Sequence, residues 1–148
     1  MNRIAPFLIL LLLALASCQK YSDEDYEGMW QLTEIAQPDG SDARDVKSSG
    51  VYWRMQLGLL LITHTGIPAD QDPGEVVARV SVSGGTLALT AVYHHLREAD
   101  IPVTDPADAL TLAPLGITAP TETFTIDCLT DSRLVLIGPA TRLTFRKY

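Results

Sequence analysis

The chain is poor in cysteine and histidine, with two cysteines and three histidines among its 148 residues. Two cysteines allow one disulfide at most, so the sequence excludes a scaffold held together by several disulfides. It also excludes a zinc site built from several thiolates. Cys18 comes after an apolar segment near the start of the chain, so Cys128 is the one cysteine in the remainder of the sequence. Because Cys128 follows Phe124 and Ile126 at alternate positions, we expect it to be a small buried residue on the same face of a strand.

Basic residues are also scarce. Eleven Lys and Arg stand against 18 Asp and Glu, which gives a formal net charge of −7. An acidic domain repels phosphate backbones, so we expect no nucleic-acid partner.

Near its start the chain has an apolar run, but one too short to span a bilayer, which takes about twenty residues. The run, 7–14, follows Arg3 and is followed by small residues that lead to Cys18. This order is typical of a secretory signal, and the cysteine makes it resemble a bacterial lipobox. The resemblance implies removal of residues 1–17 and lipidation of Cys18. The alternatives are a plain signal peptide and a membrane-spanning helix.

Residues 18–27 are predicted to be a tether behind the lipid. Four carboxylates within 23–27 repel one another and favour an extended, solvated chain. The segment is either a spacer or, by resemblance, the export signal of Gram-negative lipoproteins that reach the outer face of the outer membrane. We therefore expect a cell-envelope, outer-membrane lipoprotein held to the membrane through Cys18. Whether it faces the periplasm or the cell surface stays open.

From residue 28 onward, apolar residues alternate with polar ones, as in half-buried β-strands. Gly84-Gly85 fits a two-residue hairpin turn, and Asp105-Pro106 is predicted to begin a short helix inside the long connection 97–120. The alternation predicts eight strands: 29–35, 51–57, 59–64, 75–83, 86–94, 121–129, 133–137 and 141–148. Short turns make neighbouring strands antiparallel. Closing them into an up-and-down barrel removes the exposed edges, so we expect an all-β, eight-stranded antiparallel barrel in a single domain, 28–148.

Catalytic motifs are missing. The chain has no Gly-x-Ser-x-Gly, no His-Glu-x-x-His and no phosphate-binding loop. His94 and His95 are adjacent on a strand and point to opposite faces, so they are unsuited to chelating one ion. The aspartates of the 97–120 connection lack the glycine and final glutamate of a calcium loop. We expect no enzyme, no metal site and no cofactor.

Gly28-Met-Trp30, at the start of the first strand, resembles the Gly-x-Trp signature of the lipocalins, and the whole stretch 28–148 resembles bacterial lipocalin-like lipoproteins. The resemblance implies a lipocalin-like barrel that Gly28 and Trp30 help to close at one end. It also implies an arginine of the last strand lying across the tryptophan, for which Arg142 and Arg146 are the candidates.

An eight-stranded barrel is either filled by its own side chains or open to one small ligand. The alternation predicts that eight residues line the interior: Trp53, Met55, Leu61, Val80, Leu89, Tyr93, Phe124 and Leu136. This apolar wall suits a small hydrophobic or amphipathic ligand, and the family resemblance favours such a non-enzymatic binder. The alternative is a filled barrel that contacts another envelope protein.

Overall fold

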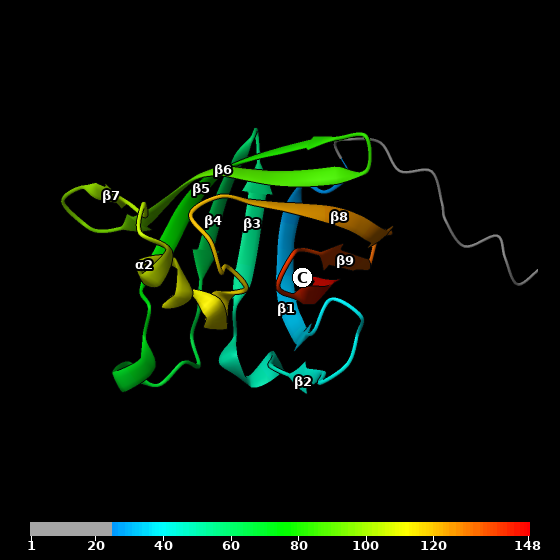
Figure 1. Cartoon of the computed structure of the whole chain (residues 1–148), viewed down its shortest axis with the longest axis horizontal. Helices are drawn as coiled ribbons and strands as arrows, with labels where there is room; N and C mark the ends of the chain where they lie inside the picture. Colours follow the sequence, from blue (N-terminus) through cyan, green and yellow to red (C-terminus); the bar gives the residue numbers. More distant parts are fainter. Residues whose placement is uncertain (1–24) are drawn as a thin grey trace, which may run out of the picture.

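The barrel is built from eight strands that follow one another along the chain. The computed structural model describes residues 25–148, so the predicted signal peptide 1–17, the predicted lipidation site Cys18 and most of the predicted tether lie outside the described residues. The eight strands are β1 (Gly28–Ala36), β3 (Tyr52–Gln56), β4 (Leu59–Thr63), β5 (Glu75–Ser83), β6 (Thr86–His95), β8 (Glu122–Leu129), β9 (Arg133–Ile137) and β10 (Arg142–Lys147) (Figure 1).

Each of these strands pairs antiparallel with the next, and β10 also pairs with β1, so the sheet closes on itself. The closing ladder runs from Trp30 opposite Lys147 to Ala36 opposite Arg142. The prediction of an all-β, eight-stranded up-and-down barrel is confirmed. Closure leaves none of the eight strands as a free edge, which is why such short strands form a stable sheet.

Shorter elements decorate the barrel. Two short strands, β2 (Arg44–Asp45) and β7 (Asp100–Pro102), extend β1 and β6. The predicted helix is present as α2 (Pro106–Leu110), and the Asp105 side chain accepts a hydrogen bond of 2.8 Å from the Ala107 N–H. Three single-turn 3-10 helices lie in the connections: η2 (Lys47–Ser49), η3 (Ala69–Gln71) and η4 (Ala113–Leu115). Within residues 25–148, no helix has the length and hydropathy needed to cross a bilayer.

The two ends of the barrel differ. At one end, which we call the closed end, strands meet in tight turns at 57–58, 84–85 and 130–132. The predicted turn at Gly84 and Gly85 has φ of 58° and 78°, values that glycine adopts readily. At the other end, which we call the mouth, lie the three long connections 37–51, 64–74 and 96–121. In Figure 1, β2 and its connection lie at the bottom and α2 at the left.

Candidate functional site

Six of the eight residues predicted to line the interior are buried there. They come from five strands and are at most 4% exposed: Trp53, Met55, Val80, Leu89, Phe124 and Leu136. Leu61 and Tyr93 are only half-buried and lie in the outward phase of their strands, so for these two the prediction is wrong.

Leu61 faces outward because of the β3–β4 hairpin register. Residues directly opposite one another in an antiparallel pair lie on the same face. Gln56 is exposed and pairs with Leu59, so the next pair, Met55 with Leu60, points inward, and Leu61 pairs outward with Arg54. The apolar run Leu59-Leu-Leu-Ile62 has no polar residue to mark its phase. Leu57, which the strand prediction had included, belongs to the turn and is 83% exposed.

Two β-bulges explain why Tyr93 and Cys128, which were both expected in the core, are only half-buried. The β5–β6 ladder pairs Arg79 with Ala91 and Val80 with Leu89, so Thr90 is an extra residue. A bulge shifts the phase of the strand beyond it, and Val92 is buried where Tyr93 had been expected. The β8–β9 ladder skips Asp127 in the same way, so Leu129 is buried and Cys128 is half-buried.

The interior is filled by the protein's own side chains. The Trp53 ring contacts the rings of Phe145 and Phe124, with centroid distances of 5.0 Å and 6.4 Å. A segment of the connection between β7 and β8, residues 103–118, adds five further apolar side chains to the same core. We call this segment the plug. Its buried residues are Val103, Ala109, Leu112, Leu115 and Ile117.

Three side-chain interactions fasten the plug to the barrel wall. The Trp53 Nε1–H donates to the Leu115 carbonyl at 2.9 Å, and His94 Nε2 lies 3.0 Å from the Asp108 carboxylate on α2. Glu122 Oε1 accepts hydrogen bonds from the Thr118 N–H, at 2.8 Å, and from the Thr118 hydroxyl. The plug is therefore a packed part of the structure.

Glu122 is the buried acid of the described chain. It lies in the inward phase of β8 at the mouth, in line with Phe124. Burial raises the pKa of its carboxyl group above the ordinary 4.5, because desolvation disfavours the charged form. Its Oε2 is buried and has no hydrogen-bond partner among residues 25–148. No sequence pattern had marked this residue, since one acid in an alternating strand is usually an outward one.

The closed end is built around Trp30, but not with the predicted arginine. The Lys147 ammonium lies 4.3 Å from the ring centroid of Trp30, directly opposite it in the β1–β10 ladder. Arg142 pairs with Asp127 at 3.0 Å, and Arg146 donates to Gln31 Oε1 at 2.6 Å, so both turn away from the ring. Phe145 points inward, so its neighbours Thr144 and Arg146 cannot, whereas Lys147 can.

Gly28 allows this contact. Its φ is +121°, which L-residues with a side chain rarely adopt, and a Cβ there would lie 2.4 Å from the Lys147 Nζ. The Trp30 indole N–H donates to the Tyr26 carbonyl at 2.7 Å. The first and last described strands are thus joined at the closed end by Gly28, Trp30 and Lys147.

A pocket of about 340 Å³ lies at the mouth. It opens where the connection after β1, the connection after β4 and η4 of the plug meet. Its apolar wall consists of Ile35, Val46, Ile67, Pro68, Ala113 and Pro114, and Arg44, Ser49 and Gln71 supply its polar groups. Arg44 is exposed and is not among the cations that form ion pairs within the described chain. The sequence did not indicate this pocket, because its residues come from the end of β1 and from three connections that are far apart along the chain.

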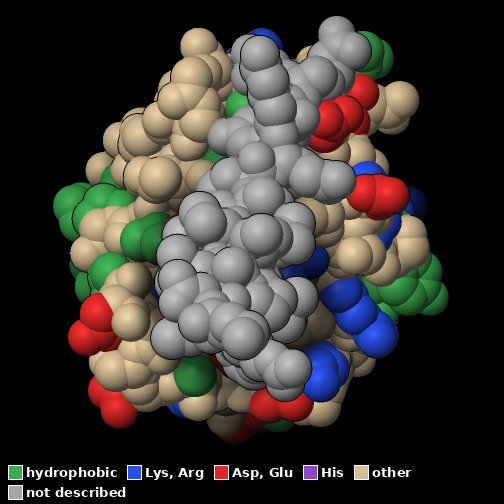
Figure 2. Space-filling view, turned by 90° about the vertical axis from the view of Figure 1, so that its right-hand side faces the viewer, with side chains coloured by type: hydrophobic (Ala, Val, Ile, Leu, Met, Phe, Trp, Pro, Cys, Tyr) green, Lys and Arg blue, Asp and Glu red, His purple; other side chains and the backbone are tan. Residues whose placement is uncertain are grey.

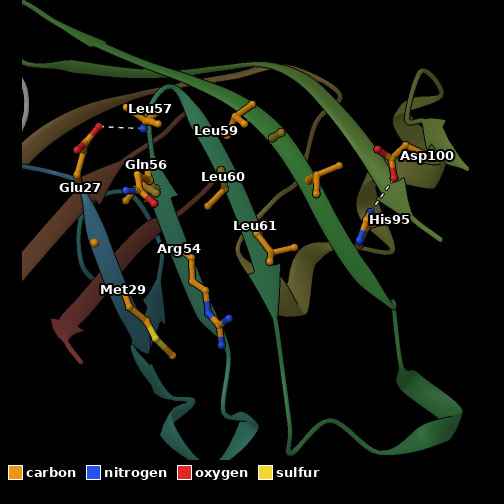
Figure 3. Close-up of a pocket in the computed structure, with 14 residues that line it drawn as sticks. Glu27, Met29, Arg54, Gln56, Leu57, Leu59, Leu60, Leu61, His95 and Asp100 are labelled. Atoms are coloured by element: carbon orange, nitrogen blue, oxygen red, sulfur yellow. Dashed lines mark hydrogen bonds and ion pairs between the residues drawn. The ribbon is translucent and has the colours of Figure 1, made fainter. Parts of the chain in front are cut away.

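A second, shallower pocket of about 970 Å³ lies on the outer wall of the barrel. It runs along the outward faces of β1, β3, β4 and β5, as Figure 3 shows. Leu59, Leu61, Met29 and Val77 form its apolar part, and Arg54 and His95 are among its polar side chains. The misassigned Leu61 therefore belongs to this outer groove and not to the interior.

The three histidines do not come together. His64 lies 2.9 Å from Asp72, His94 contacts Asp108, and His95 Nδ1 lies 2.7 Å from Asp100. Each histidine thus has its own aspartate, and all three aspartates lie in the connections at the mouth. Among residues 25–148 no group of three His, Cys, Asp or Glu side chains is placed to hold a metal ion.

The comparisons with known proteins agree with this architecture. A family model described as a lipocalin-like domain matches residues 11–148. The structure is similar to that of a lipocalin-like protein from Bacteroides uniformis ATCC 8492, with a TM-score of 0.58 and 22% identity over 84% of this chain and 99% of that one. It is also similar to an uncharacterized protein from Bacteroides eggerthii DSM 20697, with a TM-score of 0.58 and 21% identity over 83% and 99% of the two chains. No curated protein matches the sequence. The chain belongs to the lipocalin-like domain family.

Proposed function

We propose that the protein is a non-enzymatic lipoprotein of the cell envelope, anchored through a lipid on Cys18, that holds a small amphipathic molecule at the mouth of its barrel. The observation that carries the proposal is the mouth pocket of about 340 Å³, formed by three loops above an interior that is already packed. This volume lies at the lower end of the range typical of small-molecule sites, roughly 300–1,000 Å³.

The lining of the pocket supports an amphipathic ligand. Ile67 and Pro68 on one side and Pro114 on the other would contact an apolar body. Arg44 at the rim would pair with a carboxylate or another acceptor group, since a guanidinium binds planar anions through two parallel hydrogen bonds. The ligand we propose is therefore a short apolar chain or ring with one anionic end.

The proposal also replaces the interior ligand site expected from the sequence. A ligand inside the barrel would have to displace Leu112, Leu115 and Ile117, which are fully buried. Truncating one such side chain to alanine lowers the free energy of unfolding by about 2–5 kcal/mol, which indicates how much each contributes to the packed core. The mouth pocket requires no such displacement.

Native mass spectrometry of the fragment 19–148, purified gently from a bacterial host and then titrated with octanoate, tests the proposal. We expect a bound small molecule or a saturable octanoate adduct. Ile67→Asp should weaken octanoate binding about tenfold or more, because it places a carboxylate in the apolar wall. Ile101→Asp, the same change at a residue 50% exposed on β7 and away from the pocket, should leave it unchanged. Equal binding by both variants would contradict the proposal.

The packed interior favours a second candidate: a barrel that serves as a rigid scaffold for contacts with another envelope protein. A fragment that carries no endogenous molecule and takes up no octanoate would support this candidate over the first.

A further inference from the structure

The turn between β3 and β4 has an unusual composition. Leu57 and Gly58 have φ of 53° and 74°, so both central residues lie in the left-handed region of a two-residue hairpin turn. Asn, Asp and Gly suit the first of these positions, whereas a leucine is disfavoured there by its side chain. Leu57 is also 83% exposed, and Leu59, at the end of the same turn, is 55% exposed. Neither the backbone conformation nor the burial of the fold explains two leucines at this tip.

This tip lies beside the point where the described chain begins. The Leu57 N–H donates to Glu27 Oε1 at 2.9 Å, an interaction that is drawn in Figure 3. Six residues, 19–24, separate Cys18 from Asp25, and the seven steps along the chain span at most about 25 Å when fully extended. A lipid on Cys18 would therefore keep Leu57 within reach of the bilayer surface.

Charge is distributed unequally between the two ends of the barrel. The three mouth connections, 37–51, 64–74 and 96–121, contain nine acidic and three basic residues. The three closed-end turns contain one acid, Asp131, and Arg133, Arg146 and Lys147 lie next to them, as do the acids Asp25 and Glu27 at the start of the described chain. Figure 2 shows the side of the molecule where β8 ends and β9 begins, and Lys and Arg side chains gather in one area of it with Asp and Glu side chains beside them. An anionic phospholipid surface therefore repels the acidic mouth more strongly than the closed end, where acids and bases are equal in number.

We infer that the closed end docks on the phospholipid surface, with Leu57 and Leu59 inserted at the interface. The outer groove that begins at these leucines, about 970 Å³ in volume, continues their apolar surface along β4. The acidic mouth and its pocket then point away from the membrane, where a soluble ligand can reach them. The inference rests on the lipid anchor of the proposed function, and it adds an orientation and a second contact with the membrane.

The test uses the full-length lipoprotein, reconstituted in vesicles of phosphatidylethanolamine and phosphatidylglycerol, in a Cys128→Ser background. The fluorophore NBD is attached at Leu57→Cys or, as the matched control at the mouth, at the exposed Glu98→Cys. We expect the emission at position 57 to shift to shorter wavelength and to be quenched by phospholipids with brominated acyl chains. The label at position 98 should behave as it does in water.

Two further proteins carry the label at the exposed Gln56→Cys, one with Leu57 unchanged and one with Leu57→Asn. They distinguish insertion of Leu57 from mere proximity to the membrane, because Leu57→Asn should abolish the shift and the quenching. The fold should be kept, because asparagine suits the turn.

The outcomes are distinct. An intact mass that includes the lipid, together with an unshifted label at position 57, overturns the docking but not the anchor. A shifted label that brominated lipid fails to quench indicates a protein contact and also overturns it, as does equal quenching at positions 57 and 98. A mature mass without lipid overturns the anchor and the docking together. Octanoate binding at the mouth is measured separately and is affected by none of these results.

Discussion

The Nζ of Lys147 lies 4.3 Å from the ring centroid of Trp30 and joins the last described strand to the first. A cation over an aromatic ring contributes about 0.5–1 kcal/mol at an exposed site. Lys147→Ala should therefore lower the free energy of unfolding in urea by roughly this amount, and Lys147→Arg should largely restore it. The control is Lys47→Ala, which removes an exposed pair with Asp45 and should have an effect near zero. Equal losses in the two alanine variants would contradict the role given to Lys147.

Gly28 and Lys147 should be coupled. Gly28→Ala forces a side chain into a φ of +121° and against the lysine, which should cost about 1–3 kcal/mol. Part of this cost is the collision and part is the backbone strain. In a double-mutant cycle, Gly28→Ala should therefore be less damaging when Lys147 is already alanine. Additive effects of the two changes would mean that the close approach has no energetic consequence.

The plug should behave as core. Leu115 is fully buried, so Leu115→Ala should lower the free energy of unfolding by about 2–5 kcal/mol. Leu110, on the same segment, is 59% exposed, and the same substitution there should change stability by less than about 0.5 kcal/mol. Comparable small losses at both positions would show that the plug is a loosely held lid and that the interior is open to a ligand.

Glu122 should make stability depend on pH. Its pKa in the folded protein is raised above 4.5 by burial, so the folded state holds this proton more tightly than the unfolded state does. The contribution of Glu122 is then fully favourable below pH 4.5 and is lost as the pH rises through its folded-state pKa. Glu122→Gln stays neutral throughout. The difference in unfolding free energy between Glu122→Gln and the parent protein should therefore shift in favour of the glutamine variant as the pH rises above 4.5. A difference that does not vary with pH would contradict the raised pKa.

Much of the fold could be predicted from the sequence, because each strand has one face in the core and the other in solvent. The alternation of Val76, Ala78 and Val80 and the glycine pair at 84–85 carry that information locally. The predicted inward or outward direction of a side chain was wrong where the local sequence does not determine it. In the run Leu59-Leu-Leu-Ile62, no polar residue shows which side chains face outward. The bulges at Thr90 and Asp127 are set by the pairing of distant strands.

The candidate site could be predicted less well, for a physical reason. The mouth pocket combines Arg44, Ile67 and Pro114 from three separate connections, whose approach to one another depends on the packing of the whole barrel. The plug was expected only as a connection with a short helix. Leu112, Leu115 and Ile117 lie outside any regular strand, so no alternation indicated that they fill the interior.

A ligand should bind at the mouth of the barrel while the interior stays filled. Methyl-resolved NMR of the fragment 19–148 during a titration with octanoate distinguishes binding at the mouth from binding in the interior. Binding at the mouth predicts shifts of the methyl signals of Ile35, Val46 and Ile67, with those of Leu87 and Leu89 inside the barrel unmoved. Shifts at Leu87 and Leu89 without shifts at Ile67 would contradict it and would show that the ligand displaces the plug and enters the barrel.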